Sequence, residues 1–384
     1  MISFSKKDAM MITIKEVAYS LENWAPRAVA ESYDNVGLQV GRMNTPVSGV
    51  LVALDLTHDV IDEALEVGAN LIVTHHPNIF RPIRHLTDMS YVPGLALRLA
   101  ESKLAHYALH TNLDNARNGV SFALAGLLGL RNVQFLDQKE DVLQVLVVYV
   151  PEAHAESVQL AMASAGAGLI GNYDACAFSS KGTGYFRPRM AAKPFVGTEG
   201  KLHAEPEIRI ECQVEKWRLH GVLHAIQSAH PYEEVAYHVF PALQPSQNYG
   251  LGAIGELQET ITLDKYLEII CERLKTRAIR VVGNAEMPIK KVAVCGGSGG
   301  SFIALAQRSD ADLYITGDLT YHLNFEVLDD RGKPRMALAD VGHYESEWIT
   351  EELVVSRLIA LQPDVQVHRT RHSTNPTRLY IRKY

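Results

Sequence analysis

The sequence of 384 residues has few cysteines and no block of positive charge. Its four cysteines form no CxxC pair, which argues against both a disulfide framework and a thiolate zinc site. The net charge of −7, without any lysine-rich or arginine-rich run, does not favour nucleic acid as a partner. No stretch approaches the roughly 18 apolar residues of a membrane helix, and the first residues lack the apolar core of an export signal. We therefore expect a cytoplasmic protein with no membrane association.

Apolar residues make up 47% of the chain, enough to build about two core-sized domains. Near the N-terminal end, apolar strands at 50–55 and 71–74 flank a helix that Thr57 caps. Near the C-terminal end, strands at 291–295 and 312–318 flank a second helix. This recurrence predicts an α/β fold in which two similar βαβ-type lobes face each other across a metal cleft.

The middle of the chain breaks this alternation. Its strands and helices are predicted in the order βαββαβ, which is typical of an α+β ferredoxin-like unit. The polar stretches LDQKED and QPSQNYGLG bound this unit, as expected for an inserted domain. We therefore predict a tail at 1–10, an N-terminal α/β lobe at 11–132, an inserted domain at 133–248 and a C-terminal α/β lobe at 249–384.

The stretch LIVTHHP, residues 71–77, indicates where a functional site lies. A buried aliphatic strand ends there at His75 and His76, and Pro77 prevents the strand from continuing. In open α/β sheets, ligands and catalytic groups gather at the carboxyl ends of the strands. Two adjacent imidazoles at such an end therefore suggest a metal site.

Other strand ends supply more side chains of the ligand type. Asp114 follows the strand that begins at residue 105, and His343 and Glu347 lie four residues apart on one face of a predicted helix. Together with the histidine pair, they form a set of three histidines and two carboxylates. Such a set suits zinc, iron or manganese, and a carboxylate can bridge two ions about 3.5–4 Å apart. We expect two divalent ions held by His75, His76, Asp114, His343 and Glu347.

Several polar residues compete with this set or could support it. Asp318 and His322 also lie four residues apart after a strand, and could replace a ligand or orient one from outside. We favour the supporting role, and we give His110, inside a predicted strand, the same role. The segment HPYEE, residues 230–234, could be an extra metal site, but its composition favours a structural corner.

The glycine-rich turn CGGSGGS could hold a phosphate, because glycines let backbone N–H groups approach an anion. It matches neither GxxxxGK[ST] nor GxGxxG, so a tight turn without a ligand is an equal alternative. The candidate phosphate-binding residues are Gly296, Gly297, Ser298, Gly299 and Gly300.

The motifs ESYDNVGLQVG, THHPNIFRP, HTNLDN, GLGAIGEL, CGGSG, YITGD and GHYESE, in this order, closely resemble the Nif-three-like family, whose members are commonly labelled GTP cyclohydrolase I type 2 homologues. The middle segment with HPYEEVAYHVFP resembles the PII-like or CutA-like domain of the longer bacterial members. The resemblance implies a two-lobed α/β fold with a dinuclear metal cleft, and it places the ligands on the five residues named above. It also implies self-association to a homohexameric ring.

Two classes of function follow. The first is a metal-dependent hydrolase acting on a small-molecule nucleotide; in the nominal reaction of the family, water activated by metal opens the guanine ring of GTP and formate is released. A metal-dependent phosphoesterase would use the same ions. The second class is a metal-binding scaffold, carrier or regulator without turnover, in which the insert senses a ligand.

Overall fold

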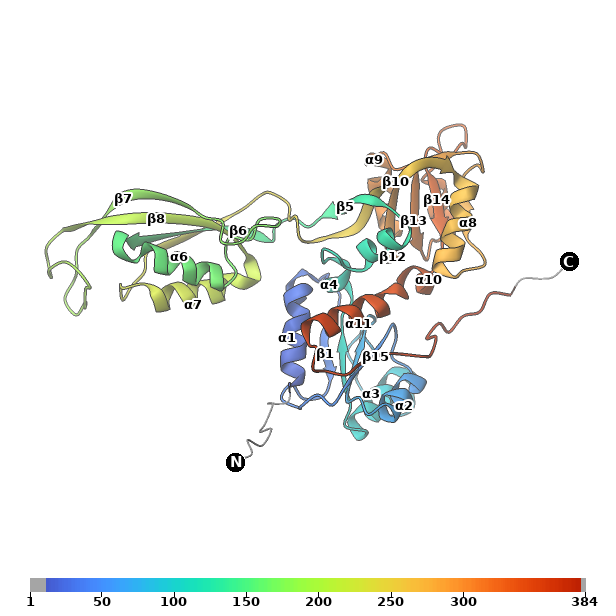
Figure 1. The fold of residues 1–384 in the computed structure, drawn as a ribbon, viewed down its shortest axis with the longest axis horizontal. Coiled ribbons are helices and arrows are strands. Elements are labelled where there is room, and N and C mark those ends of the chain that lie inside the picture. Colours follow the sequence, from blue (N-terminus) through green and yellow to red (C-terminus); the bar gives the residue numbers. More distant parts are fainter. Residues whose placement is uncertain (1–11, 381–384) are drawn as a thin grey trace, which may run out of the picture. The chain divides into compact units, whose positions relative to one another are not determined.

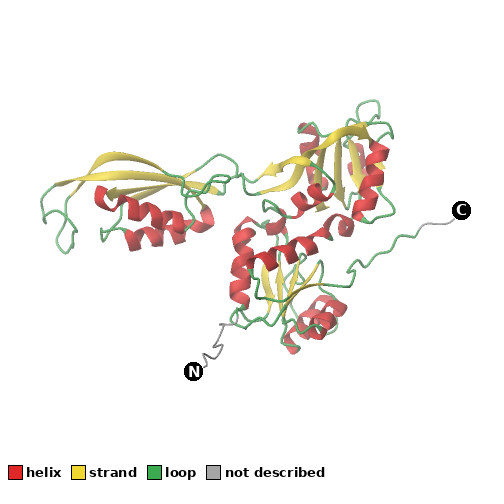
Figure 2. Ribbon diagram, viewed as in Figure 1, coloured by secondary structure: helices red, strands yellow, loops and turns green. Residues whose placement is uncertain are grey.

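The computed structural model describes residues 12–380, which form two compact units (Figure 1). One unit combines the two ends of the chain, up to Asp137 and from Tyr249 onward. The other unit is the middle segment, Gln138–Asn248. The first unit contains two sheets, each with helices packed on its faces, and the second contains one sheet with two helices (Figure 2).

The first sheet of the larger unit has five strands in the order β1-β4-β3-β2-β15. All neighbouring pairs are parallel except β1 with β4. Helices α1 and α11 pack on one face of this sheet, and α2 and α3 pack on the other. The elements are α1 (Ile14–Trp24), β1 (Gly37–Val40), β2 (Val50–Ala53), α2 (His58–Glu66), β3 (Leu71–Thr74), α3 (Tyr91–Glu101), β4 (Ala105–Ala108), α11 (Ile349–Leu361) and β15 (Val367–Arg369).

The second sheet has six strands in the order β11-β14-β13-β12-β10-β5, with β12, β13 and β14 parallel. Helices α5 and α8 pack on one face of this sheet, and α9 packs on the other. Its elements are α5 (Val120–Leu127), β5 (Arg131–Gln138), β10 (Gly250–Thr262), α8 (Leu263–Leu274), β11 (Arg280–Val282), β12 (Pro288–Ser298), α9 (Ile303–Arg308), β13 (Leu313–Gly317) and β14 (Ala337–Asp340). Two short helices, α4 (Thr111–Asp114) and α10 (His343–Glu347), follow strands of the first and second sheet respectively.

The middle unit is an antiparallel sheet in the order β7-β8-β6-β9. Helices α6 and α7 pack together on its buried face, around Val148, Val158 and Ile226. Its elements follow one another as β6 (Leu143–Pro151), α6 (Ala155–Ser164), β7 (Phe178–Phe186), β8 (His203–Glu215), α7 (Leu219–Ala229) and β9 (Tyr237–Pro241). Strand β7 is continuous from Phe178 to Phe186.

Local sequence explains several element boundaries. The Thr13 hydroxyl accepts from the Glu16 N–H, and the Glu16 carboxylate accepts from the Thr13 N–H, so a capping box begins α1. Thr57 caps α2 in the simpler way, through the Val60 N–H. His110 was predicted inside a strand, but β4 ends at Ala108, and His110 is the residue before α4.

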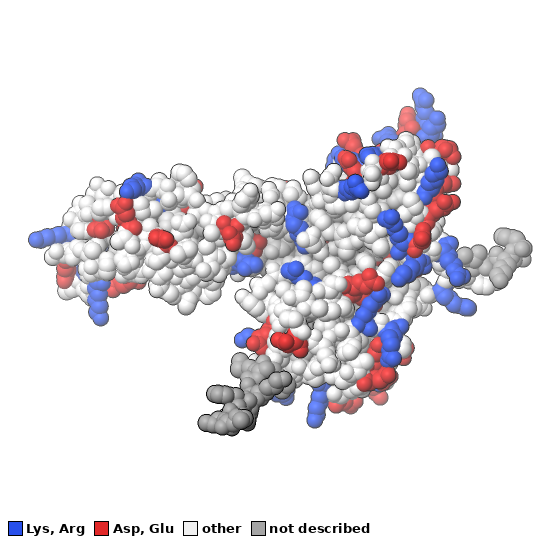
Figure 3. Space-filling model, viewed as in Figure 1, with Lys and Arg blue, Asp and Glu red and all other residues white. Residues whose placement is uncertain are grey.

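Two further features concern helix hydrophobicity and the distribution of surface charge. Within the part of the chain that the structure describes, no helix is long and apolar enough to cross a bilayer. Acidic and basic side chains are interspersed on the face shown in Figure 3.

Candidate metal centre

The histidine pair lies where β3 ends. All four residues of β3 are buried, so the strand fixes the position at which the chain emerges. The His76 N–H donates to the Leu54 carbonyl at 3.0 Å, which ties this end to the neighbouring strand segment. His75 is buried, with 1% of its surface exposed. Burying an imidazole this completely requires partners for both ring nitrogens.

The second group of side chains comes from α10, which begins directly after β14. His343 and Glu347 lie one turn apart, with His343 Nε2 3.1 Å from Glu347 Oε2. Gly342 before them has φ +95°, a conformation that disfavours any residue with a Cβ. Asp318 has φ +56°, which is uncommon for a non-glycine residue and often marks a functional site.

The two lobes bring these groups together. His76 Nε2 lies 3.0 Å from Glu347 Oε2, and His75 Nε2 lies 3.6 Å from Glu347 Oε1. Asp114 Oδ1, at the end of α4, lies 3.8 Å from His75 Nε2. The structure therefore places the other four residues predicted as ligands around the buried carboxylate of Glu347.

Each histidine directs its Nδ1 atom away from this point, toward an oxygen. His75 Nδ1 lies 2.7 Å from the Leu109 carbonyl, which can only accept, so this nitrogen carries the proton. His76 Nδ1 lies 2.7 Å from Asp55, and His343 Nδ1 lies 2.7 Å from Asp318. When Nδ1 carries the proton, Nε2 presents its lone pair to the centre. This is how outer partners usually orient metal-bound histidines.

His110 shows the same pattern. Its Nδ1 lies 2.8 Å from Asp34, and its ring lies 5.3 Å from that of His75, centroid to centroid. Ligand atoms of His75, His76 and His110 all lie within 4.8 Å of one another. His110 was predicted to support a ligand from outside, but its geometry matches that of the other three histidines.

Two buried atoms at the centre lack a hydrogen bond. These atoms are His75 Nε2 and Glu347 Oε2. In addition, His76 Nε2 lies only 3.2 Å from His343 Nε2. Lone pairs this close need a proton or a cation between them. The donor set, imidazole nitrogen with carboxylate oxygen, fits a divalent metal ion.

The pKa values of these groups reflect the crowding. Burial disfavours charge on His76, but the adjacent carboxylates of Asp55 and Glu347 raise its pKa to about 10. The adjacent Glu347 carboxylate raises the pKa of His343 to about 9. Burial raises the pKa of Asp114 well above its usual value, and the nearby Glu347 adds to this effect. A cation at the centre would relieve the repulsion between these carboxylates.

The glycine-rich turn lies against Glu347. A Cβ on Gly297, whose φ is +62°, would lie 2.3 Å from Glu347 Oε1. The Gly297 N–H donates to the Ser346 hydroxyl, and the Gly299 N–H donates to the Thr316 hydroxyl. Close approach to the candidate centre is therefore a sufficient reason for glycine at position 297.

The structure also shows the surroundings of three other residues that the sequence suggested as ligands or supporting residues. Asp318 supports His343 through Nδ1, as described above, whereas His322 is exposed, and among the described residues it belongs to no group of ligand-type side chains. Both ring nitrogens of His230 are occupied, Nδ1 by the Tyr232 N–H and Nε2 by the Tyr149 carbonyl. The HPYEE segment is thus held as a structural corner.

The sequence patterns gave no role to three residues that hold the histidines. Asp34, which lies in the motif ESYDNVGLQVG, contacts His110 and Thr111. Asp55 lies two residues after the end of β2 and contacts His76, and its second oxygen accepts from the Thr374 hydroxyl at 2.6 Å. The position of Asp55 after a buried strand was an available signal, whereas nothing local marks Thr374.

Comparison with known proteins shows the family to which the chain belongs. The model of the family described as Duf34/NIF3 (NGG1p interacting factor 3) matches residues 12–376. The chain belongs to the Duf34/NIF3 family. A Bacillus subtilis member named "GTP cyclohydrolase 1 type 2 homolog" is 39% identical, and the match covers 96% of this chain and 99% of that protein. A Halalkalibacterium halodurans protein of the same name is 40% identical over 89% of this chain and 91% of its own length.

Two solved structures show the same fold. A Bacillus cereus protein related to NIF3 is 36% identical and superposes with a TM-score of 0.85, covering 97% of this chain and all of that one. A Staphylococcus aureus protein is 27% identical with a TM-score of 0.77 and the same coverage. The mixed α/β architecture is therefore that of the family.

Proposed function

We propose that the chain is a dinuclear metal-dependent hydrolase that acts on a nucleotide. The observation that carries this proposal is the convergence of histidine Nε2 atoms from both lobes on the two oxygens of Glu347. Each histidine is already held through Nδ1, so the ligand atoms are arranged before any ion binds. Preorganisation of this kind favours metal binding over a merely structural salt-bridge network.

The position of Glu347 supports two ions rather than one. Its Oε1 atom faces His75 and its Oε2 atom faces both His76 and His343. One carboxylate that presents each oxygen to a different set of nitrogens suits a bridging ligand. Asp114 and His110 extend the set on the side of His75.

The residues present have distinct tasks in such a reaction. Divalent ions held here would supply hydroxide at neutral pH and neutralise developing negative charge. Asp55, Asp318 and Asp34 keep each imidazole in one tautomer and one orientation. The burial of His75 and Glu347 excludes bulk water, which strengthens every charge interaction at the centre.

A nucleotide is proposed as substrate from the names of the relatives and from two aromatic residues. The Phe80 ring lies 6.2 Å from His110 and 6.4 Å from Tyr33, and 43% of Phe80 is exposed. An exposed ring beside the histidines can stack on a base. For GTP, one water would add to C8 and open the five-membered ring, and a second would hydrolyse the resulting formamide and release formate.

The experiment loads the purified protein with zinc, iron or manganese and incubates it with GTP. Formate release and loss of guanine absorbance are followed together, with the His343→Ala variant as the control for the metal centre. The proposal predicts that formate release depends on both the metal and His343. Stoichiometric metal uptake without turnover of any nucleotide would instead favour the scaffold or carrier function, and release of phosphate alone would favour a phosphoesterase.

We also propose that the middle unit is a ferredoxin-like domain of the PII or CutA type. Its support is the chain order βαββαβ together with the strand order β7-β8-β6-β9. Expressing residues 138–248 alone tests whether this unit folds independently. A cooperative thermal transition is expected, and an unfolded product would contradict the domain assignment.

A further inference from the structure

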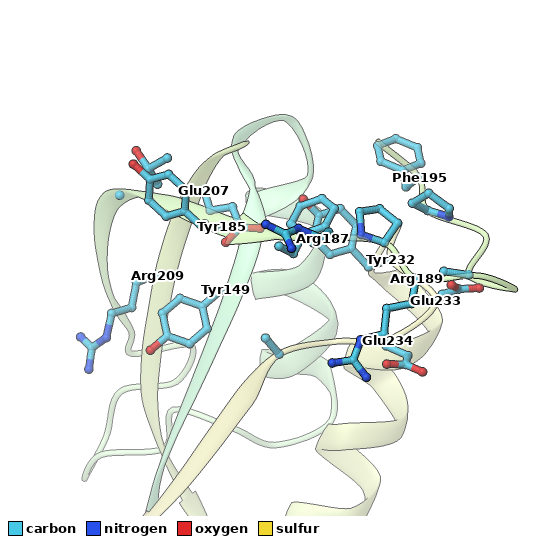
Figure 4. Close-up of a pocket in the computed structure, with 18 of the residues that line it drawn as sticks. Tyr149, Tyr185, Arg187, Arg189, Phe195, Glu207, Arg209, Tyr232, Glu233 and Glu234 are labelled. Carbon is cyan, nitrogen blue, oxygen red and sulfur yellow. The ribbon is translucent and has the colours of Figure 1, made fainter. Parts of the chain in front are cut away.

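The middle unit contains a cavity of about 1030 Å³ that the metal centre does not use. It lies between the segment that connects β7 to β8 and the turn that connects α7 to β9 (Figure 4). Its volume is at the upper end of the range for small-molecule sites in proteins. Three kinds of side chain line it, namely aromatic rings, guanidinium groups and one buried carboxylate.

The aromatic wall is held by a folded connection. The Gly200 N–H donates to the Pro188 carbonyl at 2.9 Å, which closes the connecting segment on itself. The Lys193 N–H donates to Glu233 at 2.7 Å, which ties the segment to the turn on the far side. As a result, the Phe195 ring lies 6.3 Å from the Tyr232 ring, and Phe186 lies 5.8 Å from Tyr232. Ring faces and edges thus line the cavity without filling it.

Glu207 on β8 places its carboxylate at the wall of the cavity. Only 9% of this residue is exposed. The carboxylate lies over Gly184 of the neighbouring strand, where a Cβ would come within 2.2 Å of Glu207 Oε2. Burial raises the pKa of Glu207, the Tyr232 hydroxyl beside it opposes this rise, and among the described residues no cation pairs with the carboxylate. One hydroxyl leaves other acceptor positions of this desolvated carboxylate open, and N–H groups of a ligand would fill them.

Two of the arginines that line the cavity have no acidic partner. Lys181 pairs with Glu152 and Arg209 pairs with Glu211, so these two charges are neutralised within the protein. By contrast, Arg187 and Arg189 form no ion pair within residues 12–380. Figure 4 shows Arg187 between Tyr185 and Tyr232, and Arg189 on the side of Glu234.

We propose that this cavity binds a phosphorylated small molecule that carries a planar nitrogenous ring. The guanidinium groups of Arg187 and Arg189 would hold the phosphate, because their planar donor pattern matches its oxygens. The rings of Phe195 and Tyr232 would stack on the planar ring. Glu207 would accept hydrogen bonds from ring or exocyclic N–H groups of the ligand. This site does not depend on the proposed hydrolase activity, since every residue in it belongs to the middle unit.

Calorimetric titration of the full-length protein with three probes tests the proposal. GMP carries both the ring and the phosphate, guanosine carries the ring alone, and ribose 5-phosphate carries the phosphate alone. GMP is expected to bind at least tenfold more tightly than either partial probe. Equal affinity for GMP and ribose 5-phosphate would overturn the role of the ring, and no binding of GMP would overturn the whole proposal.

A second titration separates this cavity from the metal centre. Metal-depleted protein should bind GMP as well as the metal-loaded protein does, and binding that disappears with the metal would assign the ligand to the other unit.

The double variant Arg187→Ala/Arg189→Ala should lose at least tenfold in affinity for GMP. Lys201→Ala removes a charge from the same connection outside the cavity and should bind GMP normally. Glu207→Gln should lower the affinity for GMP and leave the affinity for ribose 5-phosphate unchanged. Equal losses of affinity for both probes would contradict the role of the carboxylate.

Discussion

His76 Nε2 and His343 Nε2 lie 3.2 Å apart, although 267 positions separate these residues in the sequence. One imidazole ends a strand of the first sheet, and the other begins a helix after a strand of the second. Neither lobe alone could hold an ion with this pair. Metal binding should therefore couple the two sheets of the larger unit.

Removal of His343 is expected to lower the metal content from about two ions per chain to one or fewer, because Glu347 Oε2 would then face one imidazole, that of His76, in place of two. Elemental analysis of His343→Ala after metal loading and gel filtration measures this. His322→Ala is the matched control, because His322 is exposed and lies outside the ligand-type groups of the described residues. Full metal content in His343→Ala would contradict the proposed site.

Thr374 should influence metal affinity without touching a ligand. Its hydroxyl donates to Asp55 Oδ2 at 2.6 Å, and Asp55 Oδ1 holds His76 Nδ1. Loss of an outer partner of this kind typically costs about 10–100-fold in metal affinity. Thr374→Val keeps the shape and removes the hydrogen bond, so competition with a chelator should show weaker binding in this range.

The control for that substitution lies three residues further along. The Thr377 hydroxyl contacts only the nearby Asn375 side chain at 2.8 Å among the described residues. Thr377→Val should therefore leave metal affinity unchanged. Equal losses in both variants would indicate that the C-terminal segment acts by packing and that the hydrogen bond to Asp55 is irrelevant.

Sequence patterns could locate the strand ends and the helical pair at the candidate centre. His75 and His76 follow an unbroken apolar strand, and the spacing of His343 and Glu347 places both on one helical face. The structure brings these four residues and Asp114 together, and their binding of metal stays a prediction.

Patterns could not reveal contacts that depend on tertiary folding. Thr374 reaches Asp55 because β15 pairs with β2 and carries the following segment past the strand end, a register that no local signal specifies. The placement of His110 inside a strand was wrong for a related reason. It is the residue before the short helix α4, and its ring lies 5.3 Å from that of His75, centroid to centroid, while its role at the centre stays a prediction.

Metal affinity should fall steeply as the pH is lowered. In the metal-free protein the pKa of His76 is raised to about 10 and that of His343 to about 9, so both rings are protonated at neutral pH. An ion must displace these protons, so each costs about a decade of affinity per pH unit below its pKa. Titrations between pH 6 and 9, in two buffers that differ in ionisation enthalpy, should show proton release on binding. Affinity independent of pH would exclude these histidines as ligands.

The same shifts give the metal-free protein an opposite dependence of stability on pH. A histidine whose pKa is raised on folding stabilises the folded state below its unfolded pKa, about 6.5, and that contribution disappears as the pH rises through 9 to 10. Thermal unfolding of metal-free protein should therefore shift to lower temperature between pH 7 and 10. The metal-loaded protein should not show this loss, because its imidazoles are already neutral.

Gly297 provides a test of the close approach between the glycine-rich turn and Glu347. A Cβ there would lie 2.3 Å from Glu347 Oε1 and 3.3 Å from His343 Nε2, so alanine must displace the carboxylate that joins the two lobes. Gly297→Ala is expected to abolish tight metal binding, measured by chelator competition, and to lower the unfolding temperature. Backbone strain alone, about 1–2 kcal/mol at positive φ, would account for only part of the loss in stability.

Gly332→Ala isolates that strain. Gly332 has φ +74°, similar to the +62° of Gly297, but no atom lies within 4 Å of the position of its Cβ. This variant should lose about 1–2 kcal/mol of stability through backbone strain at positive φ, and it should bind metal normally. If Gly297→Ala behaves like Gly332→Ala, then the turn does not position Glu347, and a phosphate-binding role for its backbone becomes the better explanation of its glycines.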